Sequence, residues 1–144
     1  MEEISMREAA YIKVIGKLTK NGVEATSSVD IAKVLEVKAP SVIDMIKRLA
    51  SIGIVAYTPW KGIKLTEKGL KEYRMLIRKY KILETYFNKV LGMDLDEVCE
   101  CLSKFDVYVP SNIINAMCAC LGHPKRCPHG EEIPMEEKCC GGGE

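Results

Sequence analysis

The sequence predicts a mainly α-helical protein with one small β-hairpin, organised in two parts. Three observations support this prediction. Apolar residues recur every three or four positions along most of the 144 residues, as they do on one face of a helix. Two short β-prone runs are joined by a segment containing Pro59 and Gly62, as in a hairpin. Basic residues concentrate in the first part, and all seven cysteines follow residue 98, so the two parts differ in chemistry.

Three helices are expected before the hairpin. The first covers residues 8–20, where the apolar side chains keep helical spacing. The second begins at a capping residue, either Ser28 or Asp30. After a tight turn, the third begins near Pro40, which is tolerated in a first helical turn, and ends at Gly53. The second and third helices, with the tight turn between them, form a helix-turn-helix.

The hairpin follows directly, with strands at residues 54–57 and 63–65. Three helices and a hairpin make a winged helix-turn-helix, whose third helix enters the major groove of DNA. After the hairpin, a long helix is expected from a Thr66 cap to Gly92, with an apolar stripe that needs a packing partner. Two further helices are predicted. The first is capped by Asp94 and extends through Phe105, and the second is capped by Ser111 and ends at Gly122.

These elements divide the chain into three segments. Residues 1–72 form the winged helix-turn-helix, and residues 73–122 form a helical dimerisation and metal-sensing domain. Residues 123–144 contain three prolines and a glycine run, which favour a loop-like, Cys-rich tail. The predicted fold is therefore mainly α, a winged helix-turn-helix followed by a helical dimerisation domain.

Charge points to a polyanionic partner for the first segment. The whole chain carries a formal charge of +1, yet residues 38–81 hold 11 Lys and Arg against three acidic residues. Such a basic stretch, coinciding with the third helix and the wing, favours double-stranded DNA. The candidate DNA contacts are Lys38, Pro40, Ser41, Asp44, Lys47, Arg48 and Lys61. The alternatives are a third helix whose charges are only solvated and a winged domain that binds protein. Trp60 fits either stacking on DNA or packing against the neighbouring domain.

Other classes of protein are disfavoured. No apolar run has the length of about 18 residues that a membrane span needs, and the N-terminus is too acidic for an export signal. We therefore expect a cytoplasmic protein without membrane contact, whose cysteines are free thiols or metal ligands rather than disulfides. We expect no enzyme, because no nucleophile–base pair, phosphate loop or pair of carboxylates stands out.

Several segments together resemble the diphtheria toxin repressor family of metal-dependent, iron- or manganese-responsive transcriptional regulators. They are Tyr11-Ile12-Lys13-Val14-Ile15, Ile31-Ala32-Lys33-Val34-Leu35, Ala39-Pro40-Ser41-Val42, Gly62-Ile63-Lys64-Leu65-Thr66-Glu67-Lys68-Gly69, Leu91-Gly92-Met93-Asp94 and Cys127-Pro128-His129-Gly130-Glu131-Glu132-Ile133-Pro134. The resemblance covers about residues 6–134 and is to the short, two-domain form of the family. It implies a homodimer on a palindromic operator, with metal in the second domain controlling DNA affinity.

The family's metal ligands are mostly replaced here. At positions where the resemblance implies a ligand, this chain has Ala10, Lys13, Tyr80, Ser103 and Val107. Two carboxylates at ligand positions are kept, Glu84 and Asp106, and Cys99 also occupies one. An unaltered iron or manganese site of the usual kind is therefore not expected.

Cysteines offer a different set of ligands. Thiolates select Zn²⁺, Cu(I) or iron–sulfur clusters. The candidate metal ligands are Cys99, Cys101, Cys118, Cys120, Cys139, Cys140, Asp106 and Glu84. Because two helical residues separated by one other point about 200° apart, neither Cys-x-Cys pair closes easily on one ion. Cys118 also suits a buried apolar position, and His123 is expected to be a loop residue rather than a ligand. Cys127 and His129 belong to the closing segment of the resemblance, which does not imply that they bind metal.

The predicted function is a DNA-binding, dimeric transcriptional regulator, a repressor, that senses iron as Fe²⁺ or as an iron–sulfur cluster, with zinc as a further option. Metal occupancy would fix the spacing of two DNA-binding heads, which must match half-sites set by the DNA pitch. Two alternatives remain open. One is a thiol redox switch without metal, and the other is a winged-helix interaction or iron–sulfur assembly factor that does not bind DNA.

Overall fold

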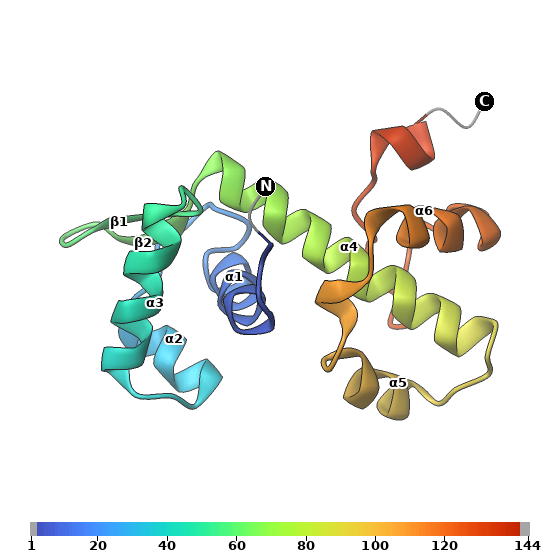
Figure 1. Cartoon of the computed structure of the whole chain (residues 1–144), viewed down its shortest axis with the longest axis horizontal. Coiled ribbons are helices and arrows are strands. Elements are labelled where there is room, and N and C mark those ends of the chain that lie inside the picture. Colours follow the sequence, from blue (N-terminus) through green and yellow to red (C-terminus); the bar gives the residue numbers. More distant parts are fainter. Residues whose placement is uncertain (1–2, 142–144) are drawn as a thin grey trace. The chain divides into compact units, whose positions relative to one another are not determined.

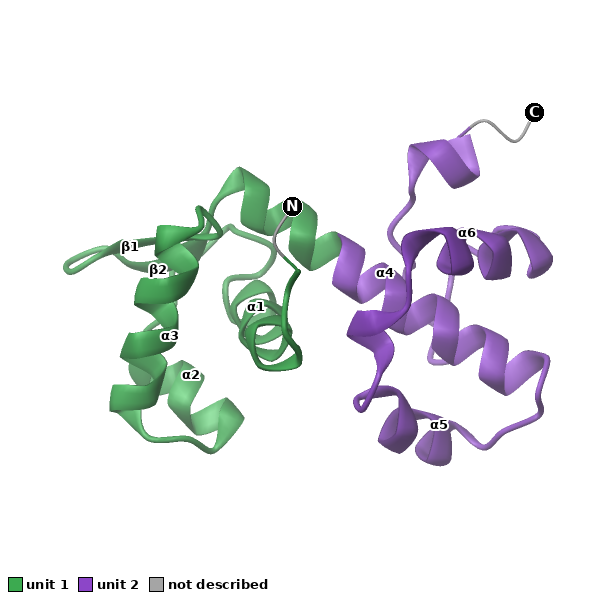
Figure 2. Ribbon diagram, in the orientation of Figure 1, with its two compact units in different colours: residues 1–74 green, residues 75–144 purple. Residues whose placement is uncertain are grey.

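A computed structural model describes residues 3–141 of the chain (Figure 1). The described residues are mainly helical, with one two-stranded antiparallel sheet, which confirms the predicted fold class. The chain divides within its longest helix into two compact units, residues 1–74 and 75–144 (Figure 2). The tail is grouped with the second unit. The functional division at residues 72 and 122 stays a prediction.

The first unit begins with three helices, α1 (Met6–Leu18), α2 (Ser28–Leu35) and α3 (Ala39–Ser51). Helix α1 begins two residues earlier than predicted because Ser5 and Glu8 form a capping box: the Glu8 N–H donates to Ser5 Oγ, and the Ser5 N–H to Glu8 Oε1. The predicted caps of α2 were wrong. Ser27 is the cap, and its Oγ accepts the Asp30 N–H at 3.1 Å.

Strands β1 (Val55–Thr58) and β2 (Gly62–Leu65) form the wing, paired from Val55↔Leu65 to Thr58↔Gly62. An isolated bridge between Thr26 and Ile63 joins the wing to the segment before α2. The core of this unit consists mainly of fully buried aliphatic side chains from α1, α2, α3, β2 and the residue before β1. Its largest members are Ile12, Ile15, Ile31, Ile46, Leu49, Ile54 and Ile63. Each buried aliphatic side chain stabilises the fold by roughly 1.5–3 kcal/mol relative to exposure.

Helix α4 (Glu67–Lys89) begins where predicted, because Thr66 Oγ1 accepts the Gly69 N–H at 3.0 Å. Close contact explains a glycine in its first turn: a Cβ at Gly69 would collide with the Ile54 carbonyl oxygen. The stripe predicted for this helix was only partly right. Of its residues, Tyr73 and Glu84 are buried, whereas Leu70, Ile77, Tyr80 and Phe87 are half-buried. In its second half the fully buried apolar side chains are Ile82 and Leu83.

The second unit continues with α5 (Leu95–Leu102), the 3₁₀ turn η1 (Asp106–Tyr108) and α6 (Ser111–Cys120). Phe105 lies outside α5, contrary to prediction, and stacks on Phe87 of α4 with ring centroids 6.0 Å apart. Asp94 occupies the cap position of α5 without a side-chain hydrogen bond. Pro110, not Ser111, is the cap residue of α6. An aspartate and a serine near a helix start are therefore insufficient to locate a cap.

The tail is more ordered than a loop. It contains an isolated bridge between Arg126 and Glu132 and a single π-helical turn, η2 (Glu137–Gly141). Packing explains this order, since Cys127 and Ile133 belong to the core of the second unit. The other buried members of that core are Ile82, Leu83, Val98, Leu102, Ile114 and Cys118. Residues 142–144 of the predicted tail lie outside the described residues.

Candidate functional site

Helix α3 presents a buried apolar face and an exposed polar face. Val42, Ile46 and Leu49 are buried, whereas Lys38, Pro40, Asp44 and Lys47 are exposed and Ser41 is half-buried. Lys38 occupies the N-cap position without capping through its side chain, so the N–H groups of the first turn lack a side-chain acceptor there. That arrangement suits a phosphate.

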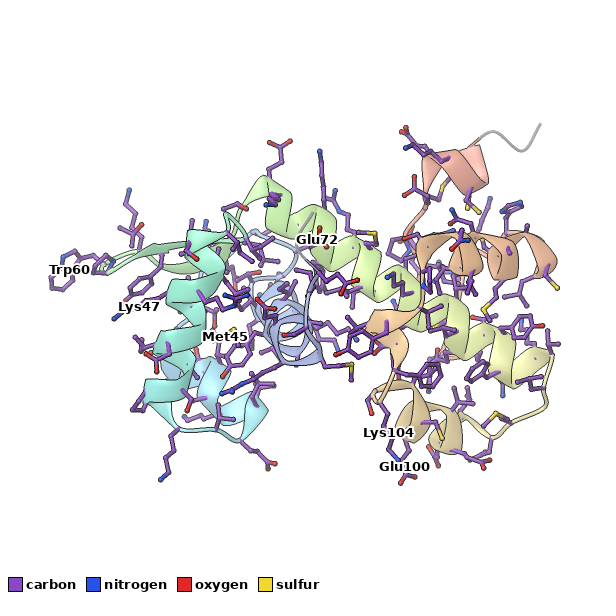
Figure 3. The ribbon with its side chains drawn as sticks, viewed as in Figure 1. Met45, Lys47, Trp60, Glu72, Glu100 and Lys104 are labelled. Atoms are coloured by element: carbon purple, nitrogen blue, oxygen red, sulfur yellow. The ribbon has the colours of Figure 1, made fainter. Side chains whose placement is uncertain are left out.

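The wing adds to this surface. Lys61 is exposed at the tip of the hairpin, and Trp60 beside it is 97% exposed. Figure 3 shows Trp60 at the hairpin tip and Lys47 projecting from α3 on the same side of the unit. The exposure of Trp60 fits contact with a binding partner better than packing within the chain. An exposed aromatic ring next to a lysine is suited to sugar or base stacking.

Arg48 is used differently from the other predicted contacts. Its Nε donates to Glu8 Oε2 of α1 at 3.0 Å, and the Glu8 side chain is 6% exposed. Burial alone would raise the pKa of Glu8, but hydrogen bonds from Ser5 and the Arg48 guanidinium hold it below its usual value. The pair connects α3 to α1. A DNA contact by Arg48 stays a prediction.

The first candidate metal centre consists of Glu84, Cys99 and His129. Cys99 Sγ donates to Glu84 Oε2 at 3.6 Å, and His129 Nδ1 lies 3.2 Å from the same oxygen. One ligand atom from each residue lies within 4.8 Å of the other two. Helix α4 supplies the carboxylate, α5 the thiol and the closing segment the imidazole. A carboxylate, a thiol and an imidazole this close together can serve as three ligands of one divalent transition-metal ion.

Sequence reasoning predicted Glu84 and Cys99 but missed His129. Glu84 is almost fully buried, at 2% exposure, so its charge needs a partner. The Cys-Pro-His-Gly string around His129 was the available signal, but it was interpreted as a structural closing segment. Only the folded chain brings this histidine next to a buried carboxylate.

Tyr80 and Asp106 lie beside this centre. Burial raises the pKa of the Tyr80 hydroxyl well above its usual value, and a hydrogen bond with Cys99 and the negative charges of Cys99, Glu84 and Asp106 raise it further. Asp106 is 2% exposed. It is not a member of the three-residue group, so its predicted role as a ligand stays a prediction. Tyr80, where the family resemblance implies a ligand, stays neutral and contacts the ligands.

A second group of potential ligands lies between α6 and the tail, and consists of Cys118, His123, Cys139 and Cys140. Burial, with hydrogen bonds to Cys140 and Cys139, raises the pKa of the Cys118 thiol to about 12. Burial opposes ionisation of Cys140, but hydrogen bonds with the Glu136 backbone, His123, Cys118 and Arg78 lower its pKa to about 7. These opposite shifts favour a thiolate at Cys140 and a thiol at Cys118.

Three predicted ligands are members of neither group: Asp106 and the two cysteines Cys101 and Cys120. Cys101 is half-buried on α5 and Cys120 is exposed on α6, and each lies two residues from a cysteine that is a member. Helical geometry explains the difference, because side chains two positions apart point in nearly opposite directions. Their predicted role as ligands stays untested. All seven cysteines are free thiols.

No helix among residues 3–141 is long and apolar enough to span a lipid bilayer. Two family models together match most of the chain. Residues 3–63 match the N-terminal DNA-binding domain of the iron-dependent repressors, and residues 66–135 match their metal-binding and dimerisation domain.

Individual relatives agree with these matches. An uncharacterised helix-turn-helix transcriptional regulator of Methanocaldococcus jannaschii is 29% identical over 107 residues, which are 74% of this chain and 86% of the relative. The crystal structure of the hypothetical protein SSo2273 from Sulfolobus solfataricus superposes with a TM-score of 0.78 at 31% identity, over 91% of this chain and 99% of that one.

The crystal structure of ScaR with bound Zn²⁺ superposes with a TM-score of 0.79 at 27% identity. The match covers 89% of this chain but 59% of ScaR. The chain thus spans a little over half the length of this relative. The two matched domains, their order and the superposition lead to one conclusion: the chain belongs to the iron-dependent repressor family, the metal-dependent transcriptional regulators related to the diphtheria toxin repressor, which are DNA-binding proteins and not enzymes.

Proposed function

We propose that this protein is a cytoplasmic, iron-responsive transcriptional repressor that binds a palindromic operator as a homodimer. The observation that carries the proposal is the Glu84, Cys99 and His129 group, in which a buried carboxylate has a thiol and an imidazole beside it. A buried carboxylate is costly without a compensating positive charge. A bound divalent cation supplies that charge.

A single Fe²⁺ ion fits this group better than an iron–sulfur cluster. The three ligand atoms lie within 4.8 Å of one another, as around one ion, whereas a cluster places its protein ligands on different iron atoms. Carboxylate, thiolate and imidazole together suit Fe²⁺ and Zn²⁺ more than the hard Mn²⁺. The matching family model is that of iron-dependent repressors, which favours Fe²⁺ as the signal.

The DNA-binding surface is assigned to the exposed face of α3 and to the wing. Lys38, Lys47 and Lys61 would contact phosphates, and the α3 N-terminus at Pro40 and Ser41 would approach the groove, with Asp44 one turn further along. The +8 balance of residues 38–81, calculated from 11 basic and three acidic residues, supports this assignment. Phosphate contacts would supply most of the affinity.

Metal binding would connect the dimerisation domain to the helix that continues into the DNA-binding unit. Cys99 belongs to α5 and Glu84 to α4, so an ion shared by them restrains α5 on α4. Exposed apolar side chains of the second unit, Val90, Leu91 and Ile113, are available for association with a second copy. In a dimer, this restraint would favour one separation of the two heads, and hence one operator spacing.

A thiol redox switch without metal is the second candidate function. Its support is the distance of 3.7 Å between Cys118 Sγ and Cys140 Sγ, from which a small movement leads to a disulfide. The Glu84 group would then be only structural, and DNA affinity would follow oxidation instead of iron.

The experiment is a comparison of operator affinity for the iron-loaded and the stripped protein, both prepared without oxygen. The operator is first selected from a random duplex library, and affinity is then measured by fluorescence anisotropy. We expect iron to tighten binding about 5- to 150-fold, the usual range of allosteric coupling, and acid-labile sulfide to be absent. Equal affinity in both forms contradicts the proposal, and stoichiometric sulfide replaces the single ion by a cluster.

Matched variants assign the effect to the site. Glu84→Gln keeps the size of the buried side chain but removes its charge, so it should abolish the response to iron. Cys101→Ser changes a half-buried thiol of the same helix as Cys99 that is not a member of the group, so its response should be unchanged. If oxidation with diamide changes affinity and iron does not, the thiol switch is the function.

A further inference from the structure

Four potential ligands from two segments converge in the second unit. Cys118 belongs to the last turn of α6, His123 follows that helix, and Cys139 and Cys140 are adjacent in η2. Cys118 is 1% exposed, and the other three are half-buried. None of the four is at a position where the resemblance to the family implied a ligand. This site is therefore independent of the Glu84 centre.

Three of the six distances between the four potential ligand atoms match those of a tetrahedral site. Cys118 Sγ lies 3.7 Å from Cys140 Sγ and 3.5 Å from His123 Nδ1, and Cys139 Sγ lies 3.7 Å from the same nitrogen. Zn–S bonds of about 2.3 Å and Zn–N bonds of about 2.0–2.1 Å, at tetrahedral angles, separate two sulfurs by about 3.8 Å and a sulfur from a nitrogen by about 3.6 Å. All four ligand atoms lie within 4.8 Å of one another.

A buried cation provides an independent indication of negative charge at this place. Arg78 is 6% exposed, and its Nη1 donates to Asn115 Oδ1 at 2.9 Å. Its Nε and Nη2 are buried and make no direct hydrogen bond among the described residues, and the guanidinium lies near enough to the Cys140 thiol to favour its ionised form. Arg78 lines the same small cavity as Cys118, His123 and Cys140. Three thiolates and an imidazole around Zn²⁺ carry a net charge of −1, which balances this guanidinium.

The local backbone conformation also brings the four side chains toward one another. His123 has a left-handed conformation, with φ of 54°, which is unfavourable for a residue with a side chain. Its N–H donates to the Cys118 carbonyl at 2.8 Å, so the turn that ends α6 brings the imidazole back toward the Cys118 thiol. In η2, the N–H groups of Cys139 and Cys140 both donate to the Glu136 carbonyl, which keeps the two thiols on one compact turn.

We propose that Cys118, His123, Cys139 and Cys140 bind a structural Zn²⁺ ion that fastens the tail to α6. Three thiolates and one imidazole are a common closed ligand set of structural zinc sites. With four protein ligands, no coordination position is left for a reactant or a sensed ion, so this ion stabilises the second unit and does not report metal status. The proposal does not depend on the function of the Glu84 centre.

The test is metal analysis of the full chain purified without oxygen and reconstituted with Zn²⁺ or Co²⁺. The double variant Cys139→Ser, Cys140→Ser should lose one tightly held zinc ion per chain, and so should His123→Ala. With Co²⁺, the wild type should show the visible bands of tetrahedral cobalt and strong thiolate-to-cobalt absorption, both lost in the variants. Circular dichroism verifies that the variants remain folded, since the substitutions avoid the buried Cys118.

Two controls separate this site from its alternatives. Cys120→Ser changes an exposed thiol on the same helix, and Glu84→Gln changes the other centre, so both should retain the zinc ion. Zinc should slow cleavage of the tail by a protease in the wild type and in both controls, but not in the tail variants. Unchanged zinc content in the tail variants overturns the proposal, as does a Cys118–Cys140 disulfide in protein saturated with zinc.

Discussion

Arg48 of α3 and Glu8 of α1 form an ion pair of 3.0 Å in which the carboxylate is buried and the guanidinium is 57% exposed. The carboxylate also closes the capping box of α1, so one side chain both starts a helix and orients the proposed recognition helix. This double use explains why a charged residue is buried here. It also makes the free energy of unfolding of the first unit depend on pH.

The first prediction concerns that dependence. Because the folded state holds the pKa of Glu8 below its usual value of 4.5, its contribution to the free energy of unfolding is complete above about pH 4.5 and is lost as the pH falls through the lower, folded-state pKa. Glu8→Gln should therefore lower the free energy of unfolding by about 1 kcal/mol at pH 7, and by less in acid. Urea denaturation at several pH values measures this. Glu24→Gln, in the exposed pair with Lys20, is the control and should change little.

A second prediction concerns Gly16, in the interior of α1. A Cβ at this position would overlap the Tyr73 ring. Alanine favours helix over glycine by about 0.5–1 kcal/mol, but overpacking costs typically 1–3 kcal/mol, so Gly16→Ala should destabilise the protein. Tyr73→Leu should recover part of the loss in the double variant, which a double-mutant cycle measures. Additive effects of the two substitutions would contradict the steric explanation.

The third prediction separates phosphate contacts from general charge. Lys61→Ala in the wing should weaken DNA binding by a similar factor on all sequences and reduce the slope of log affinity against log salt by about 1. Lys104→Ala removes an exposed charge from the second unit (Figure 3) and should leave the slope unchanged. Equal slopes for all three proteins would exclude Lys61 from the DNA interface.

The first unit was predictable from sequence because local rules determine it. A spacing of three or four residues predicts Val42, either Met45 or Ile46, and Leu49 on the apolar face of α3, and the structure buries Val42, Ile46 and Leu49. Thr66 was identified as a cap by its hydroxyl and position. Both predicted caps of α2, Ser28 and Asp30, were wrong, and Ser28 was one residue off because Ser27 and Ser28 have the same side chain. Only the backbone conformation, extended at Ser27, distinguishes them.

The sites of the second unit were only half predictable, because they depend on contacts between distant segments. Helical geometry indicates that a Cys-x-Cys pair does not close easily on one ion, and among the described residues neither pair lies together in one group of potential ligands. No periodicity, however, brings His129 to Glu84 or His123 to Cys139. Those distances follow from the packing of Cys127 and Ile133 into the core, which positions the closing segment. A histidine in a loop has no sequence signal for such packing.

The last prediction tests whether His129 is a ligand of the Glu84 centre or only its ion-pair partner. His129 Nδ1 lies 3.2 Å from Glu84 Oε2, and its side chain is 43% exposed, so its replacement should not unfold the protein. If it binds the metal, His129→Ala should weaken Fe²⁺ affinity by at least the 10- to 100-fold that loss of a supporting group costs, and operator affinity at limiting iron should fall with it. Competition with a chelator of known affinity measures the first effect. Cys101→Ser is the control, because it changes a half-buried thiol of the second unit that belongs to neither group of potential ligands, and it should leave Fe²⁺ affinity unchanged. An imidazole that only neutralises Glu84 gives the opposite pattern, in which His129→Ala retains Fe²⁺ because the ion itself replaces the lost charge.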